Sequence, residues 1–203
     1  MAPNARNCSH AAGGRTRVHR LLVVIALVVT GVGQGVAGKA DDPPAVFTQV
    51  TVHETAGVYR VSAHFEVSQP ASVARSVLTD YERIPGFMPD VKISIVRKRL
   101  PDGVIVEQEA VAHTLMFSKR IYLLLEVHMD DHSVRFHDSS GRSFEQYDGA
   151  WTLVQHDRRT IISYELIAQP CFDLPEFLLT RLLKRDSREM IERLRTEISA
   201  RSR

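Results

Sequence analysis

Cysteine is scarce in this chain, which contains only two, Cys8 and Cys171, among its 203 residues. This excludes a disulfide-rich scaffold, in which several bridges hold a small domain together. The most apolar stretch, residues 21–32, is too short to span a bilayer comfortably, because crossing one takes about 20 apolar residues. A complete glycine-rich phosphate loop and a Gly-x-Ser-x-Gly nucleophile motif are also missing. Neither a P-loop enzyme nor an α/β-hydrolase is therefore expected.

The first 40 residues are predicted to be a secretory signal peptide with a short spacer. Arg15, Arg17 and Arg20 precede the apolar stretch, and small residues follow it as far as Ala40. A basic segment, a short apolar segment and a small-residue exit are the three parts of such a leader. We therefore expect export across the inner membrane to the periplasm. The alternative is a leader that is not cleaved and anchors the protein in the membrane.

The basic character of the whole chain resides in this leader. The chain has 26 basic and 24 acidic residues, and the first 40 residues hold five of the basic ones and no acid. Residues 41–203 therefore carry a net charge of −3, from 21 basic and 24 acidic residues. This balance does not predict a nucleic-acid-binding protein. Residues 41–203 are long enough to form one domain with its own core.

This domain is predicted to be α+β, with an antiparallel sheet. Apolar and polar residues alternate through most of it, as they do in strands with one buried face. Strand patterns cover residues 46–67 (a hairpin or one bent strand), 91–99, 104–117, 119–129, 134–138, 144–155 and 160–169. Helical patterns cover residues 70–79, after the first strand, and 175–200. Because no helix interrupts the later strands, we expect a meander of six to seven strands curved around the C-terminal helix.

Residues 80–90, Asp-Tyr-Glu-Arg-Ile-Pro-Gly-Phe-Met-Pro-Asp, form a turn whose backbone is fixed by two prolines and a glycine. The turn displays Tyr81, Ile84, Phe87 and Met88, and large apolar side chains on a turn need a surface to cover. One helix about 10 Å wide cannot fill the whole concave face of such a sheet. We therefore expect an apolar pocket beneath the C-terminal helix, with this turn at its mouth.

Three segments carry a resemblance to a known family: residues 79–91 (TDYERIPGFMPDV), 149–153 (GAWTL) and 164–170 (YELIAQP). Together with the order of elements, they resemble the polyketide cyclase/dehydrase branch of the START-like, helix-grip superfamily, which includes the Coq10-type proteins. The resemblance covers about residues 45–200. It implies a helix-grip fold with a cavity for a lipid or polyketide between the sheet and the C-terminal helix. It also implies a binding or carrier protein, since many bacterial members have no demonstrated chemistry.

We accordingly predict that the domain binds a hydrophobic small molecule or lipid, without a metal, a cofactor or a catalytic residue. The predicted pocket lining is Tyr81, Phe87, Met88, Leu123, Leu125, Trp151, Tyr164 and Leu183. The same residue types also fill ordinary cores, so close packing is the alternative for each of them. An interaction module whose cavity is filled by side chains is a further hypothesis.

The rival hypothesis is a cyclase- or dehydratase-type enzyme that uses a pocket acid. Glu107 and Glu109 share one face of a long strand with His113, and they could supply a general acid or base if that face were interior. Charged residues are rarely buried without a partner, so we expect this face to contact water. His128 and His132 fall on a strand end and a turn, which does not indicate a metal site.

The C-terminal helix has a strongly basic outer face. Residues 181–203 contain eight basic and four acidic residues. Such a helix can contact anionic lipid headgroups transiently while cargo is exchanged. The alternative is a solvated face neutralised by pairs four residues apart, Glu189 with Arg193 and Arg188 with Glu192.

Overall fold

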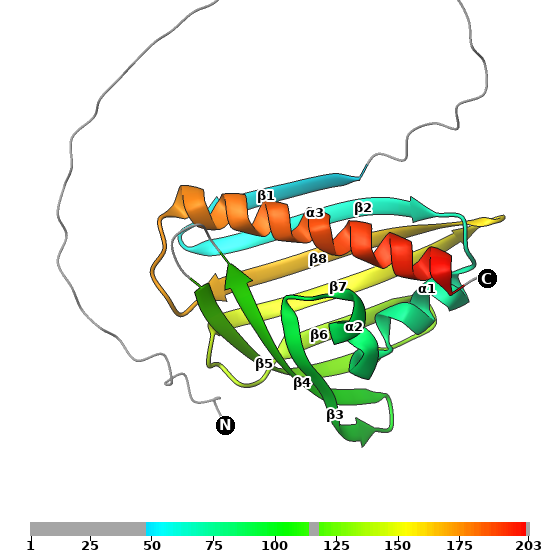
Figure 1. The fold of residues 1–203 in the computed structure, drawn as a ribbon, viewed down its shortest axis with the longest axis horizontal. Coiled ribbons are helices and arrows are strands. Elements are labelled where there is room, and N and C mark those ends of the chain that lie inside the picture. The colour runs from blue at the N-terminus through cyan, green and yellow to red at the C-terminus, as the bar shows by residue number, and fades with distance from the viewer. Residues whose placement is uncertain (1–47, 114–117, 202–203) are drawn as a thin grey trace, which may run out of the picture. The chain divides into compact units, whose positions relative to one another are not determined.

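The computed structural model describes residues 48–113 and 118–201 (Figure 1). The predicted leader, residues 1–40, lies outside them, so export stays a prediction. The strands are β1 (Gln49–Thr55), β2 (Val58–Val67), β3 (Val91–Leu100), β4 (Gly103–His113), β5 (Ser118–Met129), β6 (Ser133–Asp138), β7 (Phe144–His156) and β8 (Arg159–Pro170). The helices are α1 (Ala71–Leu78), the 3-10 helix η1 (Tyr81–Arg83), α2 (Ile84–Phe87) and α3 (Glu176–Ala200). Within these ranges no helix is both long and apolar enough to cross a membrane.

The strands form one antiparallel sheet with the order β1-β2-β8-β7-β6-β5-β4-β3. The predicted helix-grip arrangement, a curved antiparallel sheet around a long C-terminal helix, is confirmed (Figure 1). The sheet has 8 strands, however, rather than six to seven, and the short helices follow the second strand rather than the first. The extra strand arises because Ala56 and Gly57 both have positive φ, 53° and 82°. Two such residues make a tight hairpin turn, which separates β1 from β2.

Helix α3 lies across the concave side of the sheet (Figure 1). Its buried residues recur every three to five positions along one stripe: Leu179, Leu182, Ser187, Ile191, Leu194 and Ile198. The stripe packs mainly on β1 and β2, and the helix also contacts α1 and α2. Because α3 follows β1 and β2, it does not cover the concave side of the other strands to the same extent.

Candidate functional site

The concave face is built from alternate residues of the central strands. The register places Val106 of β4 beside Leu125 of β5, and Trp151 of β7 beside Tyr164 of β8. None of these four side chains is more than 8% exposed. They belong to the main hydrophobic core, together with residues of α1, η1 and α3.

The two ends of this face differ in packing. At the end that α1 covers, Val77, Leu153 and Ile162 are at most 1% exposed, so the core is filled there. At the other end β4 and β8 finish and β5 and β7 begin. Phe144 and Ala168 are buried there, but several other side chains of the same face stay half-buried. We call this region the open end; it comprises Ala110, Ile121, Phe136, Tyr147, Leu183 and Met190.

Aromatic side chains form much of the wall of the open end. The ring centroids of Trp151 and Tyr164 are 4.3 Å apart, and those of Phe136 and Tyr147 are 6.0 Å apart. The hydroxyls of Tyr147 and Tyr164 lie close enough to affect each other's pKa. Burial raises the pKa of Tyr147 to about 12 and raises the pKa of Tyr164 well above its usual value. Both phenols therefore stay protonated at neutral pH and offer hydrogen-bonding groups within an apolar wall.

Residues 80–90 fold into η1 and α2 at the rim of the concave face. Tyr81 is 8% exposed, and its hydroxyl donates to Met129 Sδ at 3.9 Å. Phe87 and Met88 are only half-buried, and no residue of α2 is fully buried. The turn predicted to cover a pocket mouth thus has one well-packed residue, Tyr81, and a loosely packed short helix.

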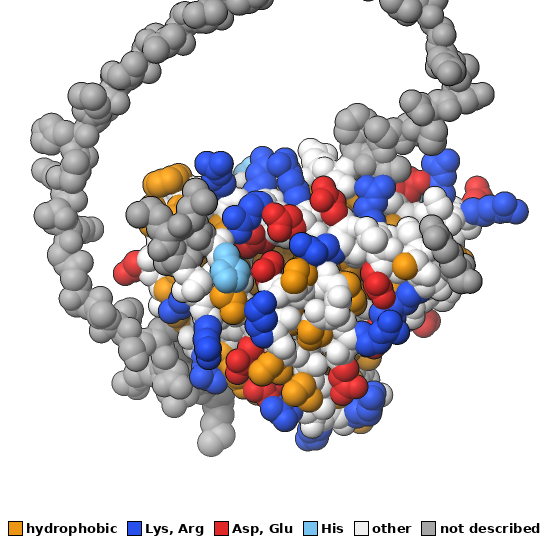
Figure 2. Space-filling model, in the orientation of Figure 1, with side chains coloured by type: hydrophobic (Ala, Val, Ile, Leu, Met, Phe, Trp, Pro, Cys, Tyr) orange, Lys and Arg blue, Asp and Glu red, His pale blue; other side chains and the backbone are white. Residues whose placement is uncertain are grey.

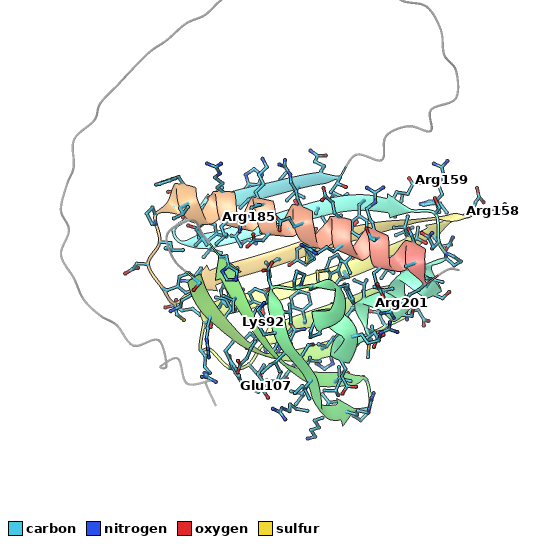
Figure 3. The ribbon with its side chains drawn as sticks, viewed as in Figure 1. Lys92, Glu107, Arg158, Arg159, Arg185 and Arg201 are labelled. Atoms are coloured by element: carbon cyan, nitrogen blue, oxygen red, sulfur yellow. The ribbon has the colours of Figure 1, made fainter. Side chains whose placement is uncertain are left out.

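This rim segment is fastened to the C-terminal end of α3 by Arg201 (Figure 3). Its Nη1 lies 2.7 Å from Asp80 Oδ2 and 3.4 Å from the carbonyl oxygen of Ser76. Its Nε lies 2.8 Å from Glu197 Oε1. The Arg201 side chain is 18% exposed. Because it is largely buried between these partners, the network fixes η1 relative to α3.

A cleft of about 400 Å³ opens between α2 and α3. Phe87 lines it from α2, and Glu189, Arg193 and Glu197 are among the residues that line it from α3. A second cleft, of about 590 Å³, is lined by residues of several strands, among them Arg60 and Glu165 of the outer face and Phe136 of the concave face. Only the first of the two lies beside the C-terminal helix.

The eight residues predicted to line a pocket are divided between these regions. Leu125 and Trp151 are in the core with Tyr81, and Leu123 is 6% exposed on the same face. Leu183 lies at the open end, and Tyr164 is in the core, 4% exposed. Phe87 and Met88 are at the rim. The role of all eight residues in ligand binding stays a prediction.

Glu107 and Glu109 do not reach the concave face. They lie beside Leu124 and Tyr122 on the outer face of the sheet, and Glu107 forms an ion pair with Arg97. Figure 3 shows Glu107 far from α3. A pocket acid would therefore have to be another residue. In the ranges that the structure describes, no group of three or more His, Cys, Asp or Glu side chains could hold a metal ion.

Two half-buried carboxyl groups lie near the open end. One is Asp138 of β6, whose charge raises the pKa of Tyr147, and the other is Asp186, which the sequence pattern did not single out. It lies on α3 between Leu183 and Met190, three and four residues away, and is half-buried. Burial raises its pKa, although the carboxylate also accepts hydrogen bonds from Arg185, at 2.9 and 2.8 Å. Asp186 could have been recognised in the sequence as an acidic residue that interrupts the apolar stripe of the C-terminal helix.

The fold and the concave apolar face define a helix-grip protein. The chain belongs to the family described as polyketide cyclase / dehydrase and lipid transport, whose profile matches residues 67–195. The resemblance seen in the sequence is thereby confirmed at the level of the family, although the match does not single out the Coq10-type branch. None of the curated proteins matches the chain.

Solved structures with this fold include proteins of different roles. A START superfamily protein from Mycobacterium smegmatis is 15% identical, with a TM-score of 0.60 over 70% of this chain and 97% of that one. A STAR-related lipid transfer protein from Xanthomonas axonopodis is 15% identical, with a TM-score of 0.57 over 75% and 98%. The Zhui aromatase/cyclase from Streptomyces sp. R1128 is 13% identical, with a TM-score of 0.62 over 72% and 96%. At these identities the likeness shows the fold alone.

Proposed function

We propose that this protein is an exported carrier that holds a hydrophobic small molecule or lipid at the open end of the concave face. The observation that carries the proposal is the half-buried state of Phe136 and Tyr147, which belong to central strands of the sheet. Apolar surface in contact with water is unfavourable by about 25 cal/mol per Å². A ligand that replaces this water gains about 0.8 kcal/mol for each CH₂ group that it buries.

Polar groups on the same wall would orient the ligand. The hydroxyl pair of Tyr147 and Tyr164 is one such group. The other is Gln108, whose Nε2 donates to Ser94 Oγ at 3.1 Å across β4 and β3. A few polar groups in an apolar site set orientation rather than affinity. The carrier would therefore accept ligands with one hydroxyl, carbonyl or similar group on an apolar body.

The rim segment supplies a route for loading. Helix α2 has no fully buried residue, and its Phe87 lines the cleft beside α3. A short helix with so few buried contacts can move at low cost in free energy. Displacement of α2 would widen the cleft toward the concave face. Delivery of the cargo would use a transient contact between α3 and the membrane surface.

The family description and the lipid transfer protein from Xanthomonas axonopodis support lipid as the cargo class. The aromatase/cyclase from Streptomyces supports the second candidate, a cyclase- or dehydratase-type enzyme. The observation that favours this candidate is Asp186, because burial raises the pKa of its carboxyl group beside the open end. An acid with a raised pKa is suited to proton transfer.

The carrier proposal is tested by extracting the purified protein with organic solvent and identifying lipids by mass spectrometry. Ala110 faces the concave side beside Ile121, so Ala110→Phe should fill the open end and reduce the recovered lipid. Ala150→Phe is the matched control, because Ala150 lies beside Glu165 and Arg135 on the outer face. Equal lipid in both variants, or no lipid in the unmodified protein, would contradict the proposal. Both variants are checked for folding by circular dichroism.

A further inference from the structure

One aromatic and three cationic side chains form a stripe along the solvent face of α3: Phe177, Arg181, Lys184 and Arg188. Their spacings of four, three and four residues place them on one face of a helix. All four are exposed, and Phe177 is 74% exposed, far more than any other exposed large hydrophobic residue of the described chain. Figure 2 views the face that α3 crosses and shows Lys and Arg side chains spread along it.

The three cations of the stripe are free to meet an external partner. The pairs expected from the sequence, Arg188 with Glu192 and Arg193 with Glu189, do not form in the described chain. Glu189 lies instead 3.8 Å from Nε of Arg185, which is on the neighbouring flank of the helix. Among the described residues no carboxylate forms an ion pair with Arg181, Lys184 or Arg188. Their charges are therefore not engaged in ion pairs within the described part of the chain.

We propose that this stripe docks on a bilayer that contains anionic phospholipid, with Phe177 entering the interface. This inference rests on the proposed carrier function and names its membrane contact. Cations attract anionic headgroups, and an aromatic ring at the same level finds apolar surroundings there. Residues 41–203 as a whole are negative, so the attraction is confined to the stripe rather than spread over the surface.

The geometry also suits cargo exchange. Leu183 and Met190, which face the open end, belong to the same helix and lie on its inner side. A helix is about 10 Å wide, so docking through the outer side of α3 brings the open end within about one helix diameter of the headgroups. The alternative partner is an acidic protein surface. It would pair with the three cations, but it would not explain an exposed phenylalanine at the start of the helix.

The test is sedimentation of the full chain with phosphatidylcholine vesicles, with and without phosphatidylglycerol. The stripe variant is Arg181→Gln/Lys184→Gln/Arg188→Gln. Its matched control is Lys98→Gln/Arg99→Gln/Arg158→Gln, which changes the net charge equally at exposed residues away from α3. Each cation near an anionic surface is worth about a fivefold change in binding at low salt, so the stripe variant should bind about 100-fold more weakly than the control.

A second readout uses Phe177→Trp. The chain has one tryptophan, Trp151, which is 8% exposed, so a blue shift on vesicle addition would report residue 177. The inference would be overturned if the stripe and control variants bound vesicles equally, or if binding did not depend on phosphatidylglycerol. An unshifted tryptophan emission would overturn it as well. Loss of vesicle binding contradicts this inference alone, because the assay needs no cargo. Absence of extracted lipid contradicts the proposed function alone.

Discussion

Replacement of Gly149 by alanine should destabilise the domain because two elements occupy the space of the new methyl group. A Cβ atom at this position of β7 would lie 2.3 Å from Phe136 Cζ and 2.7 Å from Phe136 Cε2. It would also lie 2.8 Å from the backbone oxygen of Glu165. The ring can rotate away, but the backbone of β8 is held by its pairing with β7. Relief of the clash therefore requires movement of both the ring and the strand.

Overpacking of this kind costs about 1–3 kcal/mol. For a domain of this size each kcal/mol lowers the melting temperature by about 2–4 °C, so a decrease of about 2–12 °C is expected. Urea unfolding followed by circular dichroism measures the free energy directly. Gly86→Ala is the control, because no atom lies within 4 Å of the corresponding Cβ, and it should be neutral or slightly stabilising.

A double-mutant cycle tests the assigned cause. Phe136→Leu removes both clashing ring atoms, so Gly149→Ala should cost at least about 0.5 kcal/mol less in that background. The displaced ring of Phe136 would also enter the open end, so Gly149→Ala should reduce the lipid recovered by extraction. An unchanged melting temperature in the single variant, or an equal cost in both backgrounds, would refute the reasoning.

Further predictions concern the rim and the open end. Arg201→Met removes the 2.7 Å contact with Asp80 and should lower the free energy of unfolding by about 1.5–3 kcal/mol. The control is Arg83→Gln, because Arg83 lies 3.8 Å from the same carboxylate but is 70% exposed; its loss should cost below about 1 kcal/mol. Equal costs in urea unfolding would show that the rim is not fastened by Arg201. Because burial raises the pKa of Asp186 above 3.8, the domain should lose stability as the pH rises from 3.8 through that higher pKa. Asp186→Asn should flatten this decline in melting temperature, and a parallel pH profile would contradict the assignment.

The sequence determined the local structure. Alternation of apolar residues predicted every strand, because a strand with one buried face needs this period regardless of its neighbours. Apolar residues three or four positions apart in residues 175–200 predicted α3, because a helix with one buried face needs that spacing. The prolines and the exposed apolar residues of 80–90 marked the rim segment. The strand count was too low only at residues 46–67, where the hairpin, one of the two possibilities for this stretch, is the correct one. A strand count of six to seven did not include it, and the positive φ of Ala56 in its turn is unusual for alanine.

Tertiary structure alone decided which of these faces stays accessible. The pattern puts Val127 and Phe136 on the same concave face, but Val127 is 1% exposed whereas Phe136 is half-buried. The difference depends on where α1 and α3 lie, and β2 reaches its place only by pairing with β8, about a hundred residues later. The burial of Asp186 and the unpaired stripe that starts at Phe177 depend on the same packing. Periodicity fixes the direction of a side chain, because direction is set by the local backbone. Its exposure is set by the sum of contacts with distant elements, which a local pattern does not contain.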